Sequence, residues 1–298
     1  MFHLPSPLQK LEHPLLEQHR VNLYIKRDDL INEEVSGNKW RKLKYNIAEM
    51  QRRGFKKLVT FGGAYSNHIA ATSAAANYFG FEAVGVIRGD ELNPNSNPTL
   101  KRASELGMKF YFIDRKTYRE MTQLSKIPDF PDHYIIPEGG ANPLGMKGIA
   151  EIISEIQIPF DIIITAIGTG TTISGLIQGL NGKSKVLGIS VLKGNFIQNE
   201  VETILKNSDT HHTNFEIDNS FHFGGYGKFS EKLIDFINAI STQLSIKLDP
   251  IYTGKALFGV WDMIERSKFD DQTLIFLHTG GLQGIAGYNQ KNPQKIHN

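Results

Sequence analysis

The sequence predicts an α/β protein built from two open, twisted parallel-sheet lobes. Short β-rich runs alternate with segments of helical periodicity almost from end to end of the 298 residues. This alternation is typical of parallel sheets with helices on both faces. A stretch rich in glycine and proline at residues 137–145 interrupts it near the middle of the chain. The interruption divides the strands and helices into two runs, and we expect one lobe from each.

The first run begins with a strand over residues 21–26, where apolar and polar side chains alternate as on a half-buried strand. A helix is expected over residues 40–53, because Leu43, Ile47 and Met50 recur there at helical spacing. The run then continues with strands over residues 57–61, 82–87, 109–113 and 133–136, and with helices over residues 67–79, 98–106 and 116–124.

The second run follows the interruption and has the same alternation. Its predicted strands cover residues 161–166, 185–191, 219–223, 249–252 and 273–278. Its predicted helices cover residues 148–157, 173–180, 195–206, 230–243 and 257–267. The strand over residues 21–26 is free to join either lobe.

Composition narrows the class of protein. A net charge of +2 with interspersed signs predicts neither a nucleic-acid nor a membrane partner. The absence of cysteine excludes disulfides, thiol catalysis and cysteine-ligated zinc, and the histidines lack metal-ligand spacing, so we expect no metal site. The N-terminal residues lack the basic and apolar regions of a signal peptide, which predicts a cytoplasmic protein.

The stretch from Ser36 to Leu43 contains the first candidate catalytic residue. Lys39 stands between a glycine turn and a helix start, and we predict that it is a catalytic amine carrying a covalently bound cofactor. Asn38 is expected to cap the helix. The helix N-terminus, with Arg41 and Lys42, is expected to favour the neutral amine. The alternative is an ordinary solvated basic helix face.

A phosphate site is predicted at the end of the strand over residues 161–166. Glycines there let the backbone approach a ligand, amides point inward and hydroxyls add donors; the segment comprises Gly168, Thr169, Gly170, Thr171 and Thr172. The alternative is a structural tight turn. Ile173 breaks the dinucleotide-binding fingerprint, and Gly182-Lys183-Ser184 lacks the first glycine of a P-loop.

Other strand ends provide further candidates. Ser66 or Asn67 can cap the helix that follows residues 57–61, and the free amides of that helix suit a carboxylate; plain capping is the alternative. Tyr226 and Tyr252 lie among glycines at strand ends, where stacking on a flat ligand or proton transfer is expected; a packed loop tyrosine is the alternative.

Taken together, these segments resemble pyridoxal-phosphate (PLP) enzymes of the tryptophan synthase β fold type, PLP fold type II. Within that group they resemble the 1-aminocyclopropane-1-carboxylate (ACC) deaminase and D-cysteine desulfhydrase family. The matching segments are, in order, Pro5-Ser6-Pro7-Leu8, Lys26-Arg27-Asp28-Asp29, Gly37-Asn38-Lys39-x-Arg41-Lys42-Leu43, Gly62-Gly63-x-x-Ser66-Asn67-His68, Ile136-Pro137-x-Gly139-Gly140-x-Asn142-Pro143-Leu144-Gly145, Gly168-Thr169-Gly170-Thr171-Thr172, Gly225-Tyr226-Gly227, Asp249-Pro250-x-Tyr252-x-Gly254-Lys255 and His278-Thr279-Gly280-Gly281.

The resemblance implies a role for each candidate. Lys39 would carry the cofactor as a Schiff base, and the turn from Gly168 to Thr172 would hold its phosphate. Asn67 would bond the pyridine 3-oxygen of the cofactor, and Tyr252 would lie beside its ring. Ser66 and His68, with Asn67, would lie near the substrate carboxylate. Tyr226 would face the substrate. The resemblance also implies a large domain of residues 1–45 plus 150–298, a small inserted domain of residues 46–149, and a homodimer.

Two departures favour one subfamily. Thr253 stands where ACC deaminases carry glutamate, and Thr279 stands where they carry leucine. The resemblance places both threonines at the cofactor, and both match the desulfhydrase pattern. The physical argument agrees, because a neutral hydroxyl makes the cofactor a weaker electron sink than a carboxylate does. The predicted reaction is β-elimination and deamination of a small amino acid, giving pyruvate and ammonia, with sulfide from D-cysteine. ACC deamination is the alternative reaction, and a non-enzymatic small-molecule binding module is the alternative of another class.

Overall fold

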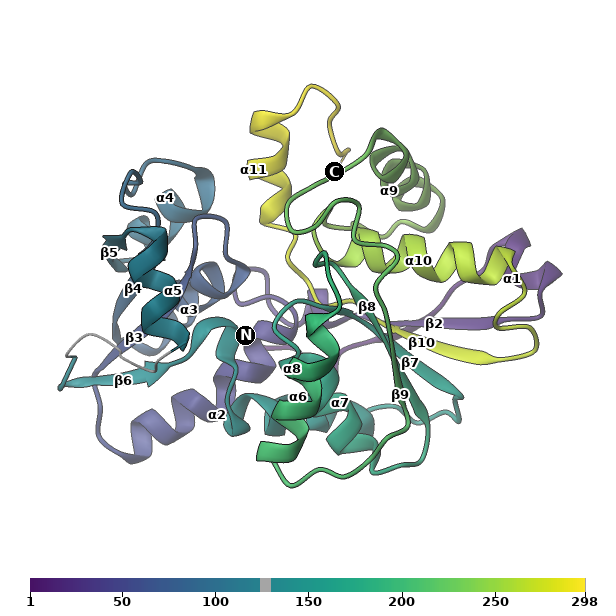
Figure 1. The fold of residues 1–298 in the computed structure, drawn as a ribbon, viewed down its shortest axis with the longest axis horizontal. Coiled ribbons are helices and arrows are strands. Elements are labelled where there is room, and N and C mark those ends of the chain that lie inside the picture. Colours follow the sequence, from purple (N-terminus) through teal and green to yellow (C-terminus); the bar gives the residue numbers. More distant parts are fainter. Residues whose placement is uncertain (124–129, 298) are drawn as a thin grey trace.

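The computed structural model describes residues 1–123 and 130–297 of the chain and contains two sheets (Figure 1). The larger sheet has the strand order β1-β2-β10-β7-β8-β9, in which only β1 is antiparallel to its neighbour. Its strands are β1 (Leu8–Lys10), β2 (Asn22–Lys26), β7 (Ile162–Ile167), β8 (Lys185–Ser190), β9 (Phe215–Asp218) and β10 (Thr273–Leu277).

The smaller sheet has the order β5-β4-β3-β6, and all of its strands are parallel. Its strands are β3 (Lys57–Gly63), β4 (Glu82–Arg88), β5 (Lys109–Ile113) and β6 (His133–Ile136). The predicted fold class of two parallel-sheet α/β lobes is therefore confirmed. The predicted domain boundaries at residues 45/46 and 149/150 stay a prediction.

Helices cover both sheets. They are α1 (Pro14–Gln18), α2 (Asn38–Arg52), α3 (Asn67–Phe79), α4 (Pro98–Glu105), α5 (Arg115–Gln123), α6 (Pro143–Ser154), α7 (Thr171–Leu180), α8 (Phe196–Asn207), α9 (Glu231–Leu244), α10 (Thr253–Glu265) and α11 (Gly284–Lys291), with 3-10 turns η1 (Asp28–Leu30) and η2 (Glu138–Gly140). Leu124, at the end of one predicted helix, lies outside the described residues. Within the described part of the chain, every helix is too short or too polar to cross a membrane.

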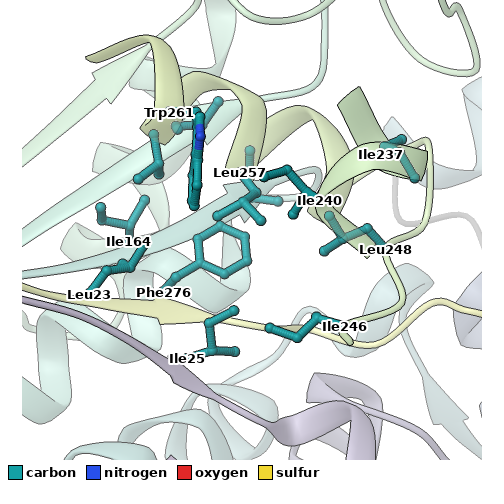
Figure 2. Close-up of a cluster of buried hydrophobic side chains, with 14 of the residues drawn as sticks. Leu23, Ile25, Ile164, Ile237, Ile240, Ile246, Leu248, Leu257, Trp261 and Phe276 are labelled. Carbon is teal, nitrogen blue, oxygen red and sulfur yellow. The ribbon is translucent and has the colours of Figure 1, made fainter. Parts of the chain in front are cut away.

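Alternation along the strands separates two cores in the larger sheet. Ile162, Ile164 and Ala166 of β7 pack with α1, α9, α10 and α11, whereas Ile163 and Ile167 pack with α6, α7 and α8 on the other face. Figure 2 shows the first core, where side chains of β2, β7 and β10 meet Leu257 and Trp261 of α10 and the two α9 residues Ile237 and Ile240. In the smaller sheet, α2, α3 and α4 cover one face and α5 the other.

Two predicted strands are wrong. Residues 219–223 form a turn, and the strand lies just before them as β9, because Asp218 accepts from the amide of Ser220 and Phe223 has a φ of 53°. Residues 249–252 precede α10 without forming a strand. Asp249 instead accepts hydrogen bonds from the amides of Ile251 and Tyr252, both at 2.9 Å, and from that of Thr253 at 2.8 Å, so this segment forms a turn that leads into α10.

Candidate active site

A cavity of about 330 Å³ lies between the lobes, where strands of both sheets end. Segments that follow β3, β6, β7, β8 and β10 contribute to its wall, as does the last residue of β4. Ligands of open parallel sheets bind at the carboxyl ends of the strands. Most of the predicted site residues line the cavity: Lys39, Ser66, Asn67, His68, Gly168, Thr169, Gly170, Thr172, Tyr226, Tyr252 and Thr279.

The turn before Lys39 is held by the far end of the chain. A Cβ at Gly37 would lie 1.9 Å from the carbonyl oxygen of Thr279, so only glycine, here at φ 66°, permits this contact. The helix begins at Asn38, and Gly37 is its N-cap, so the predicted capping by Asn38 is wrong. The Asn38 side chain instead donates to the Thr172 hydroxyl at 2.9 Å. Lys39 is thereby tied to the segments after β7 and β10.

Burial is the main electrostatic influence on Lys39. It lowers the pKa of Lys39 to about 8, and the carboxylate of Glu138 opposes it by favouring the charged form. Lys42 lines the same cavity, and burial and then the charge of Lys39 lower its pKa well below the usual range. Arg41 was expected to favour the neutral form of the Lys39 amine, and this expectation is wrong. The Arg41 side chain is fully buried in ion pairs with Asp28 and Glu155, at 2.6 and 2.8 Å.

The turn between β7 and α7 has the donors that a phosphate requires. Gly170, at φ 80°, is the N-cap of α7 and provides no side chain to satisfy the first amides. Those amides are free for an anion. Thr169 and Thr172 line the cavity beside them, whereas Thr171 is buried behind the wall with its hydroxyl 3.3 Å from that of Thr169.

The first turn of α3 combines capping with cavity lining. Ser66 Oγ accepts from the amides of His68 and Ile69 at 3.2 and 3.3 Å, so the predicted capping is confirmed. The Ser66 hydroxyl hydrogen is not used by these bonds. His68 Nε2 lies 2.8 Å from the Thr60 hydroxyl, and burial, together with the charges of Lys39 and Lys42, lowers its pKa well below the usual range. His68 is therefore neutral at neutral pH.

The two tyrosines meet at the opposite wall. The ring centroids of Tyr226 and Tyr252 are 6.1 Å apart in an edge arrangement. Burial raises the pKa of both, and a hydrogen bond between the hydroxyls raises that of Tyr252 further while lowering that of Tyr226. Both phenols therefore stay protonated at neutral pH. Tyr226 is 44% exposed and Tyr252 is more deeply buried, so Tyr226 lies on the solvent side of the pair.

The two threonines that distinguish the subfamilies occupy different positions. Thr279 lines the cavity. Thr253 is the first residue of α10, and its hydroxyl donates to Asp249 at 2.7 Å. It is not among the residues that line the cavity. A direct contact of Thr253 with the cofactor stays a prediction.

Sequence reasoning missed Arg88 and Glu138, which line the cavity, and it named Lys42 only as a charge near Lys39 and not as a cavity residue. Lys42 follows Lys39 by three residues, a spacing that places both on one helix face. Arg88 ends β4, and Glu138 follows β6 and accepts from the Tyr118 hydroxyl at 2.9 Å. These two strands lie on either side of β3 in the smaller sheet, so the rule that strand ends converge would have found both residues.

The cavity combines a partly neutral lysine amine with an anion-binding helix start, a combination suited to an aldehyde cofactor that carries a phosphate. Residues 1–280 match the family of pyridoxal-phosphate dependent enzymes. The chain belongs to this family, and its fold is PLP fold type II. The protein is therefore a PLP-dependent enzyme.

More specific similarities lie within that family. A putative ACC deaminase of Pyrococcus abyssi is 31% identical over 310 residues, covering 96% of this chain and 92% of the relative. A bifunctional D-cysteine desulfhydrase/ACC deaminase of Arabidopsis thaliana, described as mitochondrial, is 30% identical over 314 residues, covering 95% of this chain and 78% of the relative. A crystal structure of an ACC deaminase homologue superimposes with a TM-score of 0.84 at 29% identity, covering 97% of this chain and 93% of that one.

Proposed function

We propose that the protein catalyses β-elimination and deamination of a small amino acid, D-cysteine or a close analogue. The products are pyruvate and ammonia, with sulfide when a thiol leaves. The observation that carries this proposal is a lysine amine of lowered pKa facing neutral hydroxyl groups on the larger-sheet side of the cavity, where Thr279 replaces an apolar residue of the ACC deaminases.

The residues present fit pyridoxal phosphate. The amides at the start of α7, with Thr169, Thr172 and the Lys42 amine, would hold the phosphate, and Lys39 would hold the aldehyde carbon. Asn67 would donate to the ring 3-oxygen, and Tyr252 would lie beside the ring. When bound, the cofactor supplies an electron sink that stabilises negative charge at the substrate α-carbon.

The protein's own side chains supply the proton transfers. With a pKa of about 8, roughly one Lys39 amine in ten is neutral at pH 7, compared with fewer than about one in a thousand for an ordinary lysine. That amine removes the α-proton. The Ser66 hydroxyl hydrogen, free of the capping bonds, is available to the substrate carboxylate. Tyr226, protonated and partly exposed, donates to the substrate side chain.

The balance of hydroxyls and carboxylates selects the reaction. Asp249 is the carboxylate closest in sequence to Tyr252 and Thr253, but its oxygens accept from the amides of Ile251, Tyr252 and Thr253 and from the Thr253 hydroxyl. It is therefore occupied by hydrogen bonds of the turn before α10. A ring nitrogen paired with a hydroxyl such as Thr279 gives a weaker electron sink, which is enough to expel a thiolate and less suited to opening a cyclopropane.

The test is a panel of D- and L-amino acids, with ACC included and its own keto acid assayed. We expect pyruvate from D-cysteine, dependent on added pyridoxal phosphate and reduced about a thousandfold in Lys39→Ala. Keto acid formed from ACC at a higher kcat/KM than from D-cysteine would support the alternative reaction, which is the one in the name of the Pyrococcus abyssi relative. Bound cofactor without any keto acid would support a binding module.

We also propose a cytoplasmic homodimer with a large domain of residues 1–45 plus 150–298 and an inserted domain of residues 46–149. The pairing of β2 with β10 supports the discontinuous domain, because it joins the two ends of the chain in one sheet. Light scattering of the purified protein tests the dimer, and fractionation of source cells tests the compartment. Limited proteolysis near residues 45 and 149 tests the boundaries.

A further inference from the structure

The loop between β10 and α11 crosses from the larger-sheet lobe to Asn67 at the start of α3. Gln283, the residue before α11, donates a hydrogen bond from its side-chain nitrogen to Asn67 Oδ1. Gly281, at φ 89°, lies against the other end of the same amide, where a Cβ would come within 2.5 Å of Asn67 Nδ2. Two residues of this loop therefore hold both ends of the Asn67 amide.

The loop is itself braced against the smaller-sheet lobe. A Cβ at Gly287 of α11 would lie 2.7 Å from the ring of Tyr65, so the helix backbone packs directly on that ring. The ammonium group of Lys291, one turn later, lies 4.7 Å from the centroid of the same ring. In Figure 1, α11 stands between the smaller-sheet lobe and α9, in agreement with these contacts. The position of Gln283 is thus set by contacts that do not involve the cavity.

The bond from Gln283 decides which end of the amide is available. With Oδ1 accepting from Gln283, the Asn67 amide is held in the orientation that leaves the Nδ2 hydrogens at its other end. Within residues 1–123 and 130–297 no hydrogen bond from Nδ2 is formed, although Asn67 lines the candidate active-site cavity. Gln283 is not among the residues that line this cavity. It lines a second cavity, of about 490 Å³, together with Asp29, Asn32 and Lys247.

We propose that Gln283 is a positioning residue, which orients the Asn67 amide so that a donor and not an acceptor is presented to a negatively charged ring oxygen. This inference rests on the proposed function, because the oxygen belongs to the bound cofactor. It assigns Gln283 a role in cofactor affinity and in the electronic state of the ring, without contact between Gln283 and the cofactor.

Replacing Gln283 by glutamate tests the orientation. Glutamate has nearly the same shape, but its carboxylate only accepts hydrogen bonds, so Asn67 would turn Nδ2 towards it and present Oδ1 to the ring oxygen. We expect Gln283→Glu to raise the dissociation constant for pyridoxal phosphate by about tenfold or more, and to shift the absorption maximum of the bound cofactor. Gln283→Ala, which leaves the amide free to turn, should raise it less.

A packing role predicts the reverse order, because alanine removes more of the side chain than glutamate changes. The measurement is a titration of the protein, stripped of cofactor, with pyridoxal phosphate followed by absorbance. Asn32→Asp is the matched control, since it adds a negative charge to the second cavity away from Asn67, and it should bind like wild type.

A double-mutant cycle separates orientation from the added charge. In an Asn67→Ala background, Gln283→Glu should have no further effect on the dissociation constant. Wild-type affinity and an unchanged spectrum in Gln283→Glu, or a full effect without Asn67, would overturn the proposal. If wild type binds pyridoxal phosphate but converts no amino acid, the proposed function fails, and the same dissociation constants still decide the role of Gln283.

Discussion

Replacing Lys39 by methionine should make the cofactor-free protein more stable at neutral pH. Burial lowers the pKa of Lys39 from its ordinary 10.5 to about 8, so the folded state holds the proton less tightly than the unfolded chain does. Each unit by which the pKa is lowered corresponds to about 1.4 kcal/mol, so below pH 8 the charged amine destabilises the folded state by roughly 3 kcal/mol.

The measured gain should be about 1–3 kcal/mol. Lys39 retains some contact with solvent in the cavity, which relieves part of the cost of holding the charge. Methionine fills a similar volume and carries no charge. Removing the charge of Lys39 also relieves Lys42, whose pKa is lowered in part by that charge. Both effects stabilise the variant.

Urea denaturation of the cofactor-free proteins at pH 7 and above pH 10.5 measures the difference. A lysine with a lowered pKa makes stability rise with pH between the two pKa values, because the unfolded state binds the extra proton. The advantage of Lys39→Met should therefore shrink through the range from about 8 to 10.5 and vanish above it. Lys101→Met, at an exposed helix position, is the control. An advantage that does not change with pH, or a less stable variant, would refute the reasoning.

Other predictions concern the buried ion pairs and the tyrosines. Arg41→Met should cost about 3–5 kcal/mol of unfolding free energy in urea, because it leaves the buried carboxylate of Asp28 without its cation and removes one of the two cations paired with Glu155. Although burial raises the pKa of Glu155, bonds from Arg41 hold it below the ordinary range, so wild type should lose stability as the pH falls through that range, and Glu155→Gln should flatten this acid limb. In Tyr252→Phe, ultraviolet titration should show a higher pKa for Tyr226, because the stabilising hydrogen bond is lost.

The alternation of the sequence predicted both sheets because each strand carries its own apolar pattern, as residues 57–61 and 161–166 do. It failed where local hydrogen bonding outweighed that pattern. Ile251 and Tyr252 are apolar enough for a strand, yet Asp249 accepts from their amides and holds them in a turn before α10. β9 was missed because it has only four residues, and it is recognisable through its pairing with β8, which is far away in sequence.

The site was predicted where one rule applied, namely that polar turns at the ends of parallel strands meet. That rule brought Ser66, Thr169 and Thr279 to one cavity, and applied to β4 and β6 it also covers Arg88 and Glu138. Tyr252 lines the same cavity from the turn before α10, where no strand ends. Gln283 follows no such rule. It stands two residues beyond a glycine pair, and its bond to Asn67 depends on how α11 packs across the lobes.

The structure also shows that Lys39 is positioned by different segments from those that form the smaller-sheet wall of the cavity. Its position depends on Gly37 against Thr279 and on Asn38 bound to Thr172, and both contacts belong to segments after β7 and β10. Glu138, which opposes the effect of burial on the Lys39 amine, comes from the smaller sheet together with Ser66 and Arg88. A substitution on the smaller-sheet wall can therefore change which substrate fits, or how basic the amine is, without moving the lysine.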